Sequence, residues 1–121
     1  MKRRNLFLFF VIMLVIVIGI SLRPPLPGLY RGTYVSDFEM VGFRACGYKE
    51  LWWVVIDVKA VAQYSRQMAQ LTHTAAGGPI YIEWRGTPGW RSSYGPMGRY
   101  ARQFTVSEVL KVTDQPFPGC D

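Results

Sequence analysis

The chain has few of the residues on which catalytic and metal sites usually depend. Its 121 residues include two cysteines and a single histidine, His73. A zinc site built from several cysteines is therefore excluded, and a histidine-based catalytic centre has one candidate. The sequence also has no G-x-S-x-G nucleophile motif and no phosphate-binding loop that ends in G-K-[ST]. We expect no cofactor, no metal and no enzymatic activity.

The excess of positive over negative charge is also small outside the first few residues. The net charge is +6, but Lys2, Arg3 and Arg4 precede a long hydrophobic run. The remaining eleven basic residues face eight acidic ones, an excess too small to predict nucleic-acid binding. The composition, 50% hydrophobic and 15% aromatic, predicts one small folded domain rather than a disordered chain.

A hydrophobic run follows the basic residues. Leu6–Ile20 contains no charge and one glycine. The pattern predicts a signal-anchor or transmembrane helix over residues 1–22. Residues 5–22 would form a helix about 27 Å long, slightly shorter than a hydrocarbon core of ~30 Å. The alternative is a cleaved leader cut after Ser21, which we disfavour because the run has no A-x-A site.

The basic residues before this run predict its orientation. By the positive-inside rule the N-terminus is cytoplasmic, and the following domain lies outside the cytoplasm. No cysteine lies near the end of the run, so we expect no lipid-modified N-terminus. Residues 23–28, RPPLPG, cannot form a helix and predict a stiff, extended linker.

The remaining residues predict a small, mainly β domain over 29–113. Ile80, Ile82 and Trp84 alternate with polar residues, which is typical of a half-buried strand. Asp57 is a natural helix N-cap, and Gly32 predicts a bulge or a tight bend in a closed sheet. Val58, Val61, Ala62, Met68 and Ala69 have helical spacing. The predicted elements are strand-forming residues 29–47, a strand at 51–56, a helix at 57–72, a strand at 80–85, a glycine-rich loop at 86–99, a strand at 104–112 and an irregular tail at 114–121.

This order of elements favours one architecture. Three strands, a helix, a strand, a loop and a last strand are the order of the OB-fold, a five-stranded Greek-key barrel with its helix between strands 3 and 4. The alternative is an α+β sandwich with one crossover helix. Trp52 and Trp53 are adjacent, so they face opposite sides of their strand. One of them can lie in the core, and the other lies under the helix or in solvent.

Two stretches resemble a known family. YRGTYVSDFEMVGFRACGYKELWWV and the later YIEWRG…YGPMGRYARQFTVSEVLKV are similar to bacterial envelope proteins with an OB-like domain related to the C-terminal domain of NlpE-type lipoproteins. The resemblance covers about residues 30–112. It implies an OB-like fold in a bacterial envelope protein. Together with the predicted anchor, this leads us to expect the bacterial inner membrane, with the domain in the periplasm. The chain lacks the lipid-modified cysteine and the CxxC motif of those lipoproteins, so copper sensing is not implied.

The two cysteines, Cys46 and Cys120, predict a disulfide. Outside the cytoplasm thiols tend to be oxidised, and two cysteines make one bridge. A bridge that closes a loop of about 75 residues stabilises by ~4 kcal/mol in the chain-entropy model. A redox or metal pair is a weaker interpretation, because there is no CxxC motif and no nearby histidine. His73 itself is expected at the surface near the helix end, where it interacts favourably with the helix dipole.

Aromatic and arginine residues are concentrated in and around the glycine-rich loop. In the OB-fold this loop borders the usual binding face. Such side chains are typical of protein interfaces, and arginine also pairs with anionic lipid headgroups. The alternative is that Trp84 and Tyr100 fill the core while the arginines stay in solvent. The candidate partner-binding or lipid-binding residues are Trp84, Arg85, Trp90, Arg91, Tyr94, Arg99, Tyr100 and Arg102.

These features predict a membrane-anchored periplasmic binding or scaffolding module. We expect a non-catalytic accessory subunit of a larger membrane protein complex, of respiratory, photosynthetic or cell-envelope type. Its expected partners are integral membrane proteins and anionic lipid headgroups, and not nucleic acid. The alternative is a free-standing envelope ligand-binding or stress-related protein of the NlpE-like type. An enzyme would require Asp37, Glu39, His73 and Glu83 to converge in one cleft.

Overall fold

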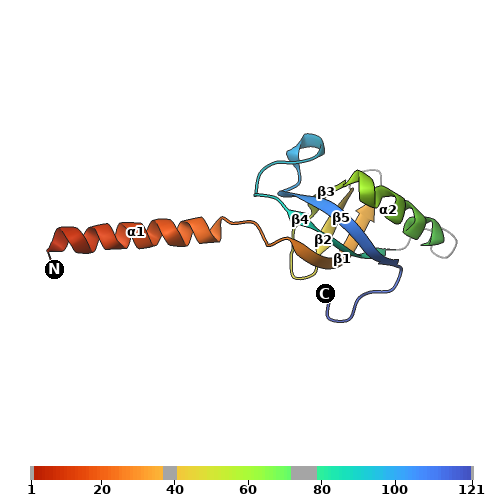
Figure 1. Cartoon of the computed structure of the whole chain (residues 1–121), viewed down its shortest axis with the longest axis horizontal. Helices are drawn as coiled ribbons and strands as arrows, with labels where there is room; N and C mark the ends of the chain where they lie inside the picture. Colours follow the sequence, from red (N-terminus) through yellow and green to blue (C-terminus); the bar gives the residue numbers. More distant parts are fainter. Residues whose placement is uncertain (1, 37–40, 72–78, 121) are drawn as a thin grey trace.

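A long apolar helix precedes a small β domain in the computed structural model, which describes residues 2–36, 41–71 and 79–120 (Figure 1). The helix, α1, spans Arg3–Ser21, and none of its residues is buried. Within the described residues it is the one helix long and apolar enough to cross a membrane. The prediction of an apolar helix over residues 1–22 is therefore confirmed.

The β domain has its elements in the predicted order. The loop expected at 86–99 begins later, because residues 86–88 continue the preceding strand and pair with the last one. His73, Asp37 and Glu39 lie outside the described residues. The elements are β1 (Gly28–Ser36), β2 (Val41–Ala45), β3 (Trp52–Ile56), α2 (Val58–Leu71), β4 (Ile80–Pro88), the short 3-10 helix η1 (Pro96–Gly98) and β5 (Arg102–Thr113).

The five strands pair in a closed order, β1-β2-β3-β5-β4 and back to β1, and so form a small barrel. β3 and β5 are parallel, and the other neighbouring strands are antiparallel. The pairing of β4 with β5 shifts register on both sides of the Trp84–Arg85 pair, as β-bulges do. Among the strands that the structure describes, closure leaves none as a free edge.

Gly32 and Gly86 lie where the backbones of this closed sheet approach most closely. A Cβ atom at Gly32 would overlap the carbonyl oxygen of Arg44, and one at Gly86 would overlap that of Thr105. The register of β1 continues through Gly32 against both neighbouring strands. The bulge predicted at Gly32 is therefore wrong, and the glycine instead allows β1 to lie very close to the backbone of β2.

Aromatic side chains fill the barrel. Phe43, Trp52, Trp84 and Phe104 are fully buried. The ring of Phe43 lies 5.0 Å from that of Trp84 in an edge-to-face contact and 5.5 Å from that of Phe104 in a stacked one, measured between centroids. Such contacts add to the free energy gained by burying the rings. The predicted inward direction of Ile82 and Trp84 is confirmed, because both are fully buried.

Helix α2 begins at its predicted cap. The Asp57 carboxylate accepts a hydrogen bond from the Lys59 backbone N–H at 3.2 Å, and its carbonyl accepts one from the Ala60 N–H at 2.8 Å. A capping side chain satisfies a donor that has no partner within the helix. The helix therefore starts directly after β3.

The buried face of α2 differs from the predicted set. Val58 and Val61 are exposed, whereas Ala60 is fully buried and Tyr64 and Met68 pack against the barrel core. Residues four apart share one face of a helix, and the orientation of α2 on the barrel selects this face. The helix predicted from the spacing of these residues is confirmed, and among them Met68 packs on the barrel while Val58 and Val61 do not. Burial, together with a hydrogen bond to Tyr34, raises the pKa of Tyr64.

Candidate functional site

Three connecting segments meet at one end of the barrel, which we call the proximal end. They are the linker 22–27, the β2–β3 connection 46–51 and the β4–β5 loop 89–101. The antiparallel pairing puts the start of β1 beside the end of β4, and the parallel pairing puts the start of β3 beside the start of β5. Figure 1 shows these segments on the side of the barrel nearest α1. The proximal end thus contains the loop that the sequence singled out.

The β4–β5 loop is an ordered extension of the two strands. The Gly89 N–H donates to the Gln103 carbonyl at 2.7 Å, and Tyr94 and Tyr100 exchange backbone hydrogen bonds of 2.9 and 3.2 Å. The tip turns through Gly95, Met97 and Gly98, all with positive φ. Met97 has a φ of 60°, a conformation that side-chain-bearing residues seldom adopt. The loop therefore presents Met97 at a defined position.

Tyr100 fixes this loop on the outer face of β2 and β3. Its side chain is buried, its ring lies 5.2 Å from that of Trp53, and its hydroxyl accepts a hydrogen bond from the Val41 N–H at 3.0 Å. A Cβ atom at Gly95 would lie within 3 Å of both rings, so the loop backbone lies directly on them. Trp53 was expected under the helix or in solvent. That expectation is wrong, because the β4–β5 loop half-covers it.

Glu50 joins the β2–β3 connection to the β4–β5 loop. Its carboxylate lies 2.8 Å from Nη2 of Arg91 and 3.4 Å from Nε of Arg102. Arg102 also donates to the Gly89 carbonyl at 2.9 Å, and its side chain is only 12% exposed. A nearly buried arginine with these partners orders the loop rather than binding from solvent.

The candidate residues therefore divide into two groups. Trp84 is fully buried in the core, as the alternative interpretation predicts, whereas Tyr100 is buried outside the barrel against Trp53. Arg85 lies on the barrel wall, where it pairs with Glu108 at 3.4 Å. The residues that the structure gathers at the surface of the proximal end are Trp90, Arg91, Tyr94 and Arg99.

Two exposed apolar residues at this end were not predicted. Met97 is 85% exposed at the loop tip, beside Arg99, whose Nη2 lies 3.4 Å from the Met97 sulfur. Leu26, in the linker, is also exposed. The sequence shows no periodicity in these segments, so only their exposure on the folded chain distinguishes them. Trp90 is 59% exposed, and its carbonyl accepts a hydrogen bond from the Tyr94 hydroxyl.

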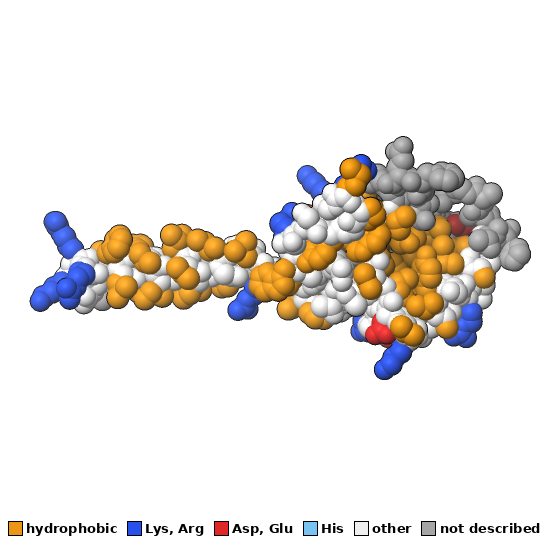
Figure 2. All heavy atoms as spheres, turned by 90° about the horizontal axis from the view of Figure 1, so that it is seen from above, with side chains coloured by type: hydrophobic (Ala, Val, Ile, Leu, Met, Phe, Trp, Pro, Cys, Tyr) orange, Lys and Arg blue, Asp and Glu red, His pale blue; other side chains and the backbone are white. Residues whose placement is uncertain are grey.

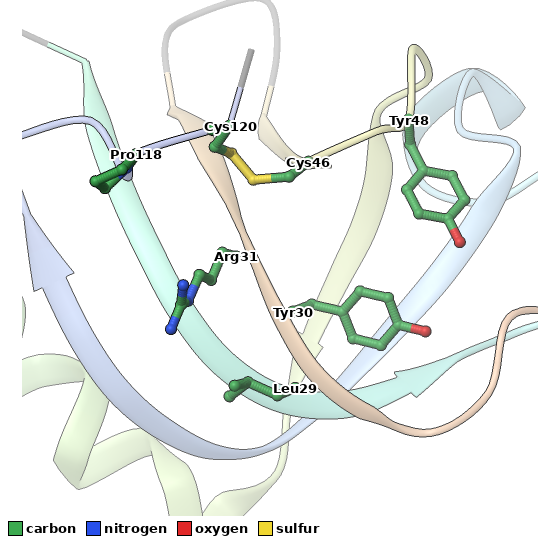
Figure 3. Close-up of a pocket in the computed structure, with 8 residues that line it drawn as sticks. Leu29, Tyr30, Arg31, Cys46, Tyr48, Pro118 and Cys120 are labelled. Carbon is green, nitrogen blue, oxygen red and sulfur yellow. A yellow bond between two sulfur atoms is a disulfide. The ribbon is translucent and has the colours of Figure 1, made fainter.

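A shallow groove of about 380 Å³ lies beside the disulfide (Figure 3). Cys46 and Cys120 form the predicted bridge, with their Cα atoms 5.0 Å apart, which ties the tail back to the barrel. Figure 3 shows the rings of Tyr30 and Tyr48 on one side of the groove and Arg31 on the other. Burial and the neighbouring Tyr48 raise the pKa of Tyr30, whose hydroxyl donates to the Leu26 carbonyl.

The charged side chain that lines this groove is engaged in a structural pair. Arg31 pairs with Glu83 and lies over the ring of Phe117 at 5.7 Å. Of the four residues that an enzyme would need to bring together, Glu83 alone is described, and it is in this pair. Within the described residues no group of three or more His, Cys, Asp or Glu side chains could hold a metal ion.

Comparison with known protein families, with curated proteins and with solved structures found no match for this chain. The fold and the sites are therefore described from the sequence and the structure of this chain alone. Function is therefore inferred from the exposed surfaces of the molecule and from its chemistry.

Proposed function

We propose that the protein is a membrane-anchored, extracytoplasmic binding or scaffolding module, an accessory subunit of a larger membrane protein complex. The fully exposed apolar helix α1, joined to a small disulfide-closed barrel, carries this proposal. A helix with apolar residues on all sides requires a membrane or a protein partner around it. In this arrangement α1 holds the barrel at one membrane, and the exposed side chains of α1 can contact neighbouring helices.

The orientation follows from the charges and the disulfide. Lys2, Arg3 and Arg4 favour a cytoplasmic N-terminus, and a disulfide persists in oxidising compartments. We infer that the barrel lies in the periplasm of a bacterium and that α1 spans the inner membrane once. Retention of α1 rather than its cleavage is part of the proposal.

The barrel itself fits the OB type. We infer an OB-fold, and the closed strand order, the parallel pairing of β3 with β5 and the position of α2 between β3 and β4 support it. In this fold ligands commonly bind on the outer face of strands 2 and 3. Here Tyr100 and the β4–β5 loop lie on that face. Because the loop covers this face, a ligand or a nucleic acid has little access to it. This favours a scaffolding role.

A second candidate is a free-standing envelope ligand-binding protein of the NlpE-like type. The groove between Tyr30, Tyr48 and the disulfide favours it, because aromatic side chains line a concave surface there. Its polar neighbour Arg31 already pairs with Glu83. The groove volume of about 380 Å³ is at the low end of the range for ligand pockets, so we prefer the scaffold.

Native extraction in mild detergent, followed by sizing and mass spectrometry, tests the proposal. We expect stoichiometric co-migration with larger integral membrane proteins. A variant in which residues 6–20 are replaced by an equally long run of leucine and alanine should stay in the membrane but leave the complex. Migration of the natural chain alone in its micelle would contradict the subunit role and favour the second candidate. An intact mass lacking residues 1–21 would contradict the anchor.

A further inference from the structure

We propose that the proximal end of the barrel rests on the anionic phospholipid headgroups of the membrane that holds α1. Met97 and Trp90 would enter the interface, and the basic side chains around them would pair with phosphates. This surface does not depend on the proposed complex, because it involves the bilayer and not the helix neighbours of α1. It also gives a role to the exposed residues of the β4–β5 loop, which the fold itself does not require.

The short linker keeps this end of the barrel close to the bilayer. Residues 22–27 join α1 to β1, and six fully extended residues span about 20 Å at most. The three prolines favour an extended and stiff segment. Its last part is held on the barrel, because the Tyr30 hydroxyl donates to the Leu26 carbonyl. The proximal end therefore stays within a short distance of the headgroups.

Exposed apolar side chains gather at the same end. Outside α1, the described part of the chain exposes large apolar side chains in two places. One is the junction of β3 and α2, with Val55, Val58 and Val61. The other is the start of β1 and the proximal end, with Leu22, Leu26, Leu29, Trp90 and Met97. Tryptophan is enriched at the membrane–water interface, where its ring is apolar and its N–H stays hydrated.

The basic excess of the domain is also located there. The three proximal segments carry four basic residues, Arg23, Lys49, Arg91 and Arg99, and one acidic residue, Glu50. The rest of the sequence from residue 23 onward is balanced, with seven of each sign. Figure 2 shows basic side chains at the end of the barrel nearest α1, with no acidic side chain visible there on this face. This charge complements an anionic lipid surface.

The loop is rigid enough to act as a preformed contact. Tyr100 packs on Trp53, and Glu50 holds Arg91 and Arg102, so the loop does not need to be ordered on docking. Met97 extends from a turn that is flanked by two glycines with positive φ. A rigid contact loses less conformational entropy when it binds. A protein partner at this end is the competing occupant, and the test below distinguishes it.

The test uses the full chain in nanodiscs whose lipids carry bromine on their acyl chains, which quenches nearby tryptophan. One set contains phosphatidylcholine alone, and the other also contains phosphatidylglycerol. We expect quenching of tryptophan emission in the anionic set, little in the neutral set, and loss of that quenching in Trp90→Phe. The other three tryptophans are buried or half-buried in the barrel, so Trp90 dominates the response.

Matched charge variants test the surface itself. The triple variant Arg23→Gln, Lys49→Gln, Arg99→Gln should lower the ratio of docked to undocked barrel about fivefold per charge, on the order of 100-fold together. The control Lys59→Gln, Arg66→Gln, Lys111→Gln removes the same charge from exposed positions on α2 and β5 and should leave docking nearly unchanged. Met97→Asn should also weaken docking, because asparagine tolerates positive φ and removes only the apolar group.

Several outcomes would overturn the proposal. Equal quenching in both lipid sets would show that anionic lipid is not recognised. Equal loss in the two triple variants would show that net charge, and not this surface, matters. Hydrogen-exchange protection of residues 89–101 in native membranes, but not in anionic nanodiscs, would assign the surface to a protein partner. Far-UV circular dichroism of each variant confirms that the barrel is folded.

Discussion

The two strands that flank the β4–β5 loop and the loop itself carry the same kinds of residue with opposite roles. Trp84 is fully buried, whereas Trp90 is 59% exposed. Arg102 is nearly buried and bound to Glu50 and Gly89, whereas Arg99 is exposed at the loop tip. Composition placed all four in one candidate site. Where each residue lies relative to the strand ends decides its role. Some residues hold the proximal end together, and others are exposed on its surface.

The largest test of this comparison exchanges each tryptophan for alanine. Trp84→Ala should cost about 3–5 kcal/mol of stability, because it removes a ring from the centre of a closed aromatic core. Trp90→Ala should change stability by about 0.5 kcal/mol or less. Urea unfolding of the full chain in mild detergent, followed by fluorescence of the remaining tryptophans, measures both. Comparable losses in the two variants would show that the loop belongs to the core.

The second comparison is between the tail and the barrel wall, which the disulfide joins. The paired change Cys46→Ser, Cys120→Ser should lower the free energy of unfolding by about 2–4 kcal/mol. It frees the tail in the folded state and removes a constraint on the conformations of the unfolded chain. Reduction of the natural chain should have a similar effect, whereas the double variant should not respond to reductant. Non-reducing mass spectrometry checks the bridge, since a mass matching two free thiols would refute it.

Tyr100 and Tyr94 bond to each other through their backbones but differ in the role of their hydroxyls. Tyr100→Phe removes the acceptor of the half-buried Val41 N–H and should cost about 1–3 kcal/mol. Tyr94→Phe removes a hydroxyl that donates to the exposed Trp90 carbonyl and should cost about 0.5 kcal/mol or less. Amide hydrogen exchange at Val41 should quicken in the first variant alone. Unchanged exchange there would mean that the loop does not hold β2.

The sequence predicted much of this fold because several of its elements carry clear local patterns. The inward direction of Ile82 and Trp84, the Asp57 cap and the order of elements follow from local patterns that the structure retains. The covered state of Trp53 could not be predicted in this way. Trp53 is covered by Tyr100, which lies far along the chain. The local pattern of apolar residues around Trp53 cannot predict that a distant loop folds back on its strand.

The candidate site was less predictable for a related reason. Aromatic and arginine residues serve equally well in a core, in an internal ion pair and at a surface, so their types do not decide among these roles. Arg102 is internal because Glu50 reaches it from the β2–β3 connection. Met97 was missed because a single methionine in a glycine-rich loop shows no periodicity, and its exposure depends on how the loop folds.

The smallest effect is expected from ion pairs, and it sharpens the distinction between internal and surface arginines. Arg85→Gln breaks an exposed pair with Glu108 and should cost at most about 1 kcal/mol, less in high salt. Arg102→Gln should cost more, because the side chain is 12% exposed and also holds the Gly89 carbonyl. It should also quicken hydrogen exchange across residues 89–101, which Arg85→Gln should not change. If both variants lose equal stability and the loop amides exchange at the natural rate in each, Arg102 does not order the proximal end. The preformed surface would then depend on Tyr100 alone.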